Sequence, residues 1–199
     1  MKTVWQILLF IGIVVLSYLI YDSVMTPIRF NKEKDRRYDK TIERLKDIRT
    51  AQLAYRSQYN KYTGSFDTLI NFVKFDSFKV VKAIGSLDDS AAVAEGRISR
   101  DTIRVSVLDS LFKNGYPIDS LRFAPFVKTP FEMAAGEIET GSKVKVKVFE
   151  CKVHNDVLLN GLDRQLIVNL NDQRKKLNKY PGLQVGSLTE ATNNAGNWE

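Results

Sequence analysis

The chain has 199 residues, 44% of them hydrophobic, and carries a formal net charge of +7. This length is sufficient for a membrane anchor and one globular domain whose core needs neither disulfides nor metals. Cys151 is the only cysteine and His154 is the only histidine. An intrachain disulfide is therefore excluded, and so are most histidine-based metal sites and catalytic relays.

An apolar segment opens the chain. Residues 4–21 read VWQILLFIGIVVLSYLIY and contain no charge. As a helix they would extend over about 27 Å, close to the thickness of the hydrocarbon core of a bilayer. Trp5 lies near one end, and Tyr18 and Tyr21 lie near the other, as in the aromatic belts of membrane interfaces. After a short tail at residues 1–3, the sequence predicts a transmembrane helix over 4–21, in contact with membrane lipid.

A cleaved signal peptide is the alternative to a retained anchor. The segment after the apolar run, DSVMTPIRF, has no small-x-small cleavage pattern, so we favour a signal anchor and a single-pass protein. The signals for orientation oppose each other. Only Lys2 precedes the span, whereas six basic residues follow it between Arg29 and Lys40, and the positive-inside rule then places the domain in the cytoplasm. However, the first charge after the span is Asp22, and acids dilute the basic cluster.

A second helix is expected after a juxtamembrane linker at residues 22–31, where Pro27 is expected to break or kink the chain. From Lys32 to Tyr62, apolar residues draw a stripe along one helical face: Tyr38, Ile42, Leu45, Ile48, Tyr55 and Tyr59. The stripe is either a coiled-coil seam or the packing face of a helix on a sheet, and the drift in its phase favours the second. We expect the stripe to be buried and the basic residues beside it to remain in water: Arg44, Lys46 and Arg56.

The same segment is strongly charged. Nine of the thirty basic residues lie between Arg29 and Arg49, and five acids are interleaved with them. Interleaved charges on one helix are typical of a solvated face. We favour that interpretation over contact with anionic lipid or nucleic acid.

Shorter elements are expected beyond Tyr62. Ser65 is a plausible N-cap for a short helix. From Phe78 the apolar period changes to two and predicts short antiparallel strands, at residues 78–84, 101–108, 121–126, 131–138 and 143–153. An Asn-Gly turn is expected at 114–115. The last strand changes its apolar face between Val148 and Phe149, as a β-bulge would require.

The remaining segments complete the expected domain. Residues 157–170 fit either a strand or a helix. We therefore expect residues 32–188 to form a soluble α+β domain in which the amphipathic helix packs on a mostly antiparallel sheet. Residues 189–199 form a polar tail that is either flexible or docked. Its one aromatic side chain, Trp198, is a candidate contact with a partner.

Few residues could support catalysis. Cys151 and His154 are three positions apart on an expected strand, so their side chains point to opposite faces and do not form a nucleophile–base pair. Cys151 fits a core position. The acid pairs at 88–89 and 137–139 have no histidine or cysteine cluster beside them. The sequence predicts no catalytic residue, no metal site and no cofactor.

One arrangement within the first 75 residues has a parallel in a known family. An apolar helix runs on into an amphipathic one that ends in the motifs Ala51-Gln52-Leu53-Ala54-Tyr55 and Tyr59-Asn60-Lys61-Tyr62, followed by Gly64-Ser65-Phe66-Asp67-Thr68-Leu69. This arrangement resembles type IV pilins and type II secretion pseudopilins. The resemblance implies a pilin-like fold, an extracytoplasmic domain and a structural role. The family's leader glycine has no counterpart in residues 1–10 and no acid precedes Asp22, so prepilin processing is not implied.

These features predict a non-enzymatic, single-pass protein of the bacterial inner (cytoplasmic) membrane with an extracytoplasmic domain. Its expected role is structural or scaffolding, through protein partners in an envelope assembly or as a homo-oligomer. The alternative is a cytoplasm-facing adaptor whose basic juxtamembrane helix binds anionic lipid or nucleic acid.

Overall fold

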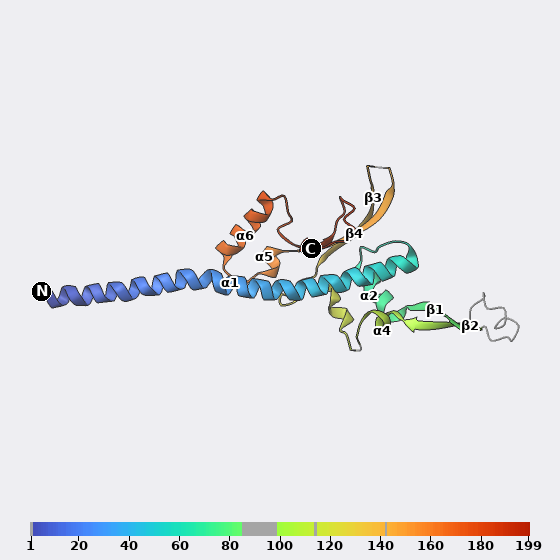
Figure 1. Cartoon of the computed structure of the whole chain (residues 1–199), viewed down its shortest axis with the longest axis horizontal. Helices are drawn as coiled ribbons and strands as arrows, with labels where there is room; N and C mark the ends of the chain where they lie inside the picture. Colours follow the sequence, from blue (N-terminus) through green and yellow to red (C-terminus); the bar gives the residue numbers. More distant parts are fainter. Residues whose placement is uncertain (1, 85–98, 114, 142) are drawn as a thin grey trace.

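The computed structural model describes residues 2–84, 99–113, 115–141 and 143–199. Its dominant feature is α1 (Lys2–Tyr59), a single helix of 58 residues that runs along the long axis of the molecule (Figure 1). At about 1.5 Å per residue, this helix is about 87 Å long. Its N-terminal half projects freely and its C-terminal half is flanked by the rest of the chain, so the molecule is a rod with a domain at one end.

The helix passes through Pro27 without a break, so the linker expected at residues 22–31 is wrong. Proline lacks an N–H, which leaves the carbonyl of Ser23 without its usual helical donor. Tertiary packing supports this turn, because residues 25–27 are half-buried and Phe30 belongs to the core. The domain therefore begins at about Phe30, on the same helix as the apolar segment.

The other elements lie on two sides of the C-terminal half of α1 (Figure 1). One side holds α2 (Phe66–Phe75), β1 (Ser77–Ile84), β2 (Ser99–Ser106), α4 (Val107–Leu111) and the 3₁₀ helix η1 (Ile118–Arg122). The other side holds β3 (Glu132–Glu139), β4 (Lys145–His154), α5 (Asn155–Leu158), α6 (Arg164–Lys176) and β5 (Gly182–Gly186). α1 packs against β5 on one side and against α2 and η1 on the other.

The described strands pair antiparallel, and the fold is α+β as expected. β3, β4 and β5 form a three-stranded sheet with β4 at its centre, whereas β1 and β2 form a separate two-stranded hairpin. β3 and β4 pair without offset along the whole of β3, so the bulge expected within 143–153 does not form there. Instead, both faces of β4 are covered. Phe149 joins the main core, and Val148 lines a pocket formed with the C-terminal segment.

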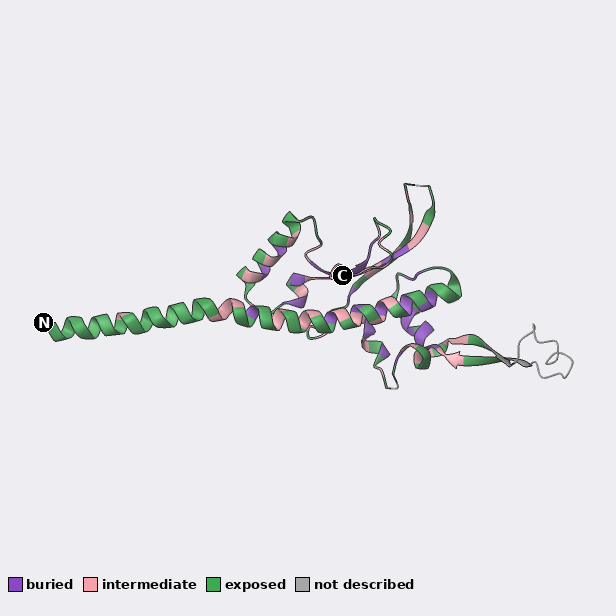
Figure 2. Cartoon of the chain, in the orientation of Figure 1, coloured by how far each residue is buried: buried purple, intermediate pink, exposed green. Residues whose placement is uncertain are grey.

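The core surrounds the C-terminal half of α1 (Figure 2). Leu45 and Ile48 are fully buried and Tyr55 is 7% exposed. Tyr38 and Ile42 are half-buried against the same cluster. Tyr59 is 44% exposed, although its ring packs on Tyr55. The cluster also includes side chains from α2, β4 and β5: Leu69, Phe72, Val73, Phe149, Cys151, Val153, Leu183 and Val185.

Two expected strands differ from the structure. Residues 121–126 are not a strand, because the chain forms η1 and then a turn bridged at Phe123 and Pro130. Ile118 and Leu121 are both buried, as the three-residue period of a 3₁₀ helix allows. β2 ends at Ser106, whose hydroxyl accepts a hydrogen bond from the N–H of Asp109 and caps α4.

Residues 157–170, for which the sequence allowed either a strand or a helix, are mainly helical and belong to α5 and α6. Asp163 caps α6 by accepting a hydrogen bond from the N–H of Leu166 at 2.9 Å. The acid pair expected at residues 88–89 and Asn114 of the expected Asn-Gly turn lie outside the described residues.

Candidate interaction surfaces

The N-terminal half of α1 is a continuous exposed apolar surface (Figure 2). Its 18-residue apolar window has a mean hydropathy of 2.3, and no described residue of the chain covers that window. Trp5, Tyr18 and Tyr21 project from it and are exposed. A helix of this length and composition is able to cross a membrane.

The basic residues after this segment fall into two groups. Arg37 turns into the domain, where its guanidinium donates to the carbonyls of Leu158 (3.0 Å) and Asn160 (2.9 Å). It also pairs with Glu33 at 3.1 Å and holds the pKa of that carboxyl below its usual value. The second group remains on the exposed surface: Arg29, Lys32, Arg36 and Lys40. Arg36 pairs there with Glu33 and Lys40 pairs with Glu43, while the half-buried Lys34 pairs with Asp35. Part of the charge therefore stabilises the fold, and part is available to a charged surface.

Arg44 does not remain in water, contrary to expectation. Its Nη1 donates to the carbonyl oxygen (2.5 Å) and the hydroxyl (2.7 Å) of Ser120, and its guanidinium lies 5.9 Å from the ring centroid of Tyr116. Lys46 and Arg56 are exposed. The pattern of α1 alone gives no signal for the Arg44 contact, because its partner lies 76 positions away.

Gln52 is a buried polar residue that the apolar stripe did not single out. Its amide nitrogen donates to the carbonyl oxygen of Thr63 at 2.6 Å, and its amide oxygen accepts from the N–H of Thr63 at 3.1 Å. These two hydrogen bonds satisfy the N–H and the C=O of Thr63 and hold the turn after α1 against the helix.

Exposed apolar side chains gather at the end of the domain farthest from the N-terminus. Phe75, the last residue of α2, is 79% exposed, and it lines a groove with Tyr59. The β1–β2 hairpin projects from the same end (Figure 1). Val80 and Ile103 pair across the hairpin, and both are exposed. We call these four residues the distal patch. Because a two-stranded hairpin is marginally stable alone in water, packing against a partner would stabilise it.

Cys151 and His154 have separate structural roles. Cys151 is fully buried in β4, and burial raises the pKa of its thiol. His154 is half-buried, and its Nδ1 accepts a hydrogen bond from the N–H of Asp156 at the start of α5. Among the described residues, no group of three or more His, Cys, Asp and Glu side chains could hold a metal ion.

The C-terminal tail docks on the domain. Gly196 bridges to Val185 beside β5, and Glu199 forms an ion pair with Arg49 at 2.7 Å. Trp198 is half-buried against the core, as a docked tail requires, and its contact with a partner stays a prediction. A Cβ atom on Gly196 would lie 2.3 Å from the indole ring, so a larger residue at this position would displace Trp198.

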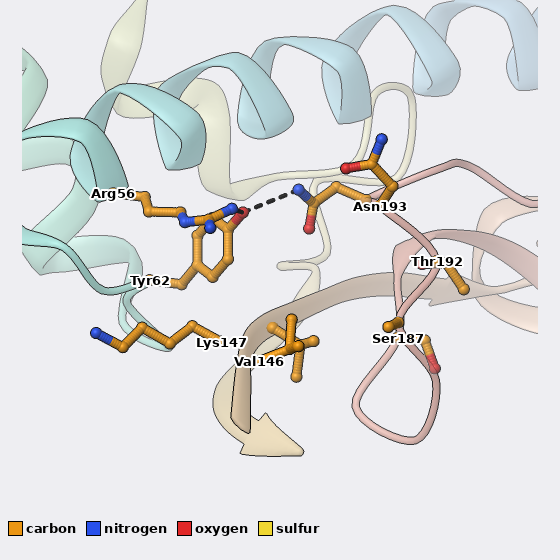
Figure 3. Close-up of a pocket in the computed structure, with 10 residues that line it drawn as sticks. Arg56, Tyr62, Val146, Lys147, Ser187, Thr192 and Asn193 are labelled. Atoms are coloured by element: carbon orange, nitrogen blue, oxygen red, sulfur yellow. Dashed lines mark hydrogen bonds between the residues drawn. The ribbon is translucent and has the colours of Figure 1, made fainter. Parts of the chain in front are cut away.

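A small polar pocket of about 160 Å³ lies between the end of α1, β4 and the tail (Figure 3). Arg56 and Tyr62 line one side, Lys147 comes from β4, and Thr192 and Asn194 come from the tail. The hydroxyl of Tyr62 accepts hydrogen bonds from Nη1 of Arg56 (3.0 Å) and from the amide of Asn194 (2.9 Å). Nothing in the apolar periodicity predicts this pocket, because its residues come from three distant segments.

Comparisons of the chain with protein-family models, with curated proteins and with solved structures found no match. Its function is therefore inferred from its own residues and contacts.

Proposed function

We propose that this chain is a single-pass protein of the bacterial inner membrane whose pilin-like domain is a non-enzymatic structural component of an envelope assembly. The continuity of α1 carries the proposal. One helix supplies an exposed apolar segment of membrane-spanning length and then the buried spine of an α+β domain. The resemblance to type IV pilins and pseudopilins implies this same arrangement.

A rigid connection to the membrane suits a scaffold. Because α1 is helical throughout its described length, the domain has no linker on which to swing. Tyr59 lies about 57 Å beyond Tyr21 along the helix. The distal end of the domain is thus held at a set height above the membrane, where a neighbouring protein can meet it.

We assign the protein–protein contacts to the distal patch. Among the large apolar side chains that the structure describes outside the apolar half of α1, Phe75 has the highest exposed fraction, at 79%. Large exposed apolar surfaces on a soluble domain are typical of interaction sites. Nucleic acid is disfavoured as the partner, because acids are interleaved with the basic residues of α1 and Arg37 and Arg44 are engaged within the domain.

A second candidate function is favoured by the charge asymmetry around the span. Basic residues are concentrated after it, and the exposed ones would face anionic headgroups if the domain lay in the cytoplasm: Arg29, Lys32, Arg36 and Lys40. The chain would then be a cytoplasm-facing adaptor that uses this segment to bind anionic lipid or nucleic acid.

Reporter fusions at the C-terminus separate the two candidates. Alkaline phosphatase activity supports the extracytoplasmic scaffold, whereas an inactive phosphatase together with cytoplasmic fluorescence would assign the adaptor. Carbonate extraction of the unfused protein tests the anchor, and retention in the membrane fraction is expected. Recovery in the soluble fraction, at a mass lacking about 25 residues, would replace the anchor with a cleaved signal peptide.

The structural role is tested by purification from membranes in mild detergent after crosslinking. Phe75→Ser is expected to reduce the partner protein or second copy that co-purifies, without changing membrane retention. Leu177→Ser is a matched control, because Leu177 is 68% exposed but follows α6, away from the distal patch. Equal recovery of partners with Phe75→Ser and the wild type would argue against the distal patch as the contact.

A further inference from the structure

We infer that the polar pocket beneath the C-terminal tail binds a carboxylate group carried by a protein partner. The inference rests on the proposed function, since it concerns how that partner is recognised. The pocket lies between α1, β4 and the tail (Figure 3), and its volume is about 160 Å³. One water molecule takes up about 30 Å³ in the liquid, so a carboxyl group and a few waters fit.

The hydrogen bonds in the pocket leave donors without acceptors. Tyr62 is more than nine-tenths buried, and its oxygen already accepts hydrogen bonds from Arg56 and Asn194. A phenolic hydroxyl has one proton to donate, and no described residue accepts it. The hydroxyl of Thr192 is also buried, and no described residue is its partner. Buried donors of this kind are costly unless an acceptor arrives.

The charge of the pocket selects an anionic acceptor. Arg56 uses one N–H on the Tyr62 hydroxyl and keeps others available, with its guanidinium 5.3 Å from the centroid of the Tyr62 ring. Lys147 also lines the pocket, but its ammonium donates to the carbonyl of Asn60 and points away from the tail (Figure 3), so Arg56 supplies the positive charge. Among the described residues that line the pocket, none is Asp or Glu. A carboxylate offers two acceptor oxygens and one negative charge, and it complements these donors.

The position of the pocket excludes lipid as the source of the anion. Arg56 lies about 52 Å beyond Tyr21 along α1. The headgroup layer extends only about 5–8 Å beyond the hydrocarbon core, so it does not reach the pocket. The pocket instead lies near the same end of α1 as the distal patch. An acidic side chain or chain end of a bound protein is therefore the expected occupant.

The test is a titration of the full-length, ¹⁵N-labelled protein in detergent micelles, followed by NMR. The probe is the blocked tripeptide acetyl-Gly-Glu-Gly-amide, and its Gln counterpart is the matched control. We expect the Glu peptide to shift the amide signals of Tyr62, Thr192 and Asn194 and to saturate in the millimolar range, and the Gln peptide to shift none. Inorganic phosphate is a third probe, and binding tighter than that of the Glu peptide would overturn the carboxylate assignment.

Variants connect the shifts to the pocket. Arg56→Gln is expected to weaken binding by about tenfold or more, and Thr192→Val to weaken it by a smaller factor. Lys46→Gln, at an exposed cation of the same helix, is expected to change nothing. The amide spectrum of each variant checks its fold. Lack of saturation, equal shifts with the Gln peptide, or undiminished binding in both pocket variants would contradict the inference. If partner recovery remains sensitive to Phe75→Ser in that event, the proposed function stands without this site.

Discussion

At the scale of single residues, Leu45 is the strongest test of how α1 packs. Leu45 is fully buried, whereas its neighbour Lys46 is exposed. Leu45→Ala is expected to lower the free energy of unfolding by about 2–5 kcal/mol, because it leaves a cavity in the core. Lys46→Ala is expected to change it by less than about 0.5 kcal/mol. Urea unfolding of a soluble fragment that begins at Arg29 measures both, and equal effects would make α1 a free stalk or an oligomeric seam.

Cys151 gives a prediction about pH. Burial raises the pKa of its thiol in the folded state, whereas an unfolded thiol ionises near about pH 8.5. Stability from this group is therefore fully present below about pH 8.5 and is lost as the pH rises above it. When the pH is raised from about 7.5 to about 9.5, the free energy of unfolding of the wild type should fall by about 1.4 kcal/mol more than that of Cys151→Ala. Urea unfolding of both proteins at the two pH values measures the difference. Equal decreases in their free energies of unfolding would mean that the thiol is accessible in the folded state.

The sequence identified some of the important residues and not others, for a physical reason. Leu45 and Ile48 follow from helical periodicity, because burial against a domain repeats every three or four residues. Gln52 and Arg44 do not follow from it. Their roles depend on hydrogen bonds to Thr63 and Ser120, which chain folding brings to α1 from beyond the helix. The polar pocket could not be predicted for the same reason, because chain folding brings its residues together from distant segments.

At the scale of elements, the docked tail yields a prediction. A Cβ atom on Gly196 would lie 2.3 Å from the Trp198 ring, so Gly196→Ala should displace the indole and loosen the tail. The amide protons of Gly186 and Asn197, which bond to Ala195 and Gln184, should then exchange faster with solvent. Hydrogen exchange measured by NMR is the readout. Gly141→Ala is the control, because no atom lies within 4 Å of the added Cβ. Unchanged exchange in Gly196→Ala would show that Trp198 does not secure the tail.

The apolar period of the sequence predicted secondary structure correctly where the tertiary contacts favour the same element. The period-two segments near residues 78–84 and 131–138 are strands in the structure. The pattern was wrong at residues 121–126, because burial of both Ile118 and Leu121 favours a 3₁₀ helix that ends at Arg122. It was also wrong at Pro27, where packing around Phe30 supports the helix through the proline. Propensity is a weak preference that tertiary contacts override.

At the scale of the whole molecule, the apolar and packed halves of α1 form one element. The sequence divided this helix into an anchor, a linker and a domain helix, because proline and the first charges after the span suggested boundaries. The structure joins them, and in the proposed membrane protein this continuity sets the height and orientation of the domain relative to the membrane. The proposed structural role in an envelope assembly depends on the same feature.

The distance between two spin labels on α1 tests this continuity most directly. Ile20→Cys and Lys40→Cys place labels at two exposed positions on either side of Pro27, and the native Cys151 is fully buried. The full-length protein is reconstituted in liposomes, and the distance is measured by double electron–electron resonance. A continuous helix predicts a narrow distribution centred at about 30 Å between the backbone positions. A broad distribution, or one centred at a clearly shorter distance, would show that the chain bends or is flexible at Pro27 and would contradict the rigid connection between membrane and domain.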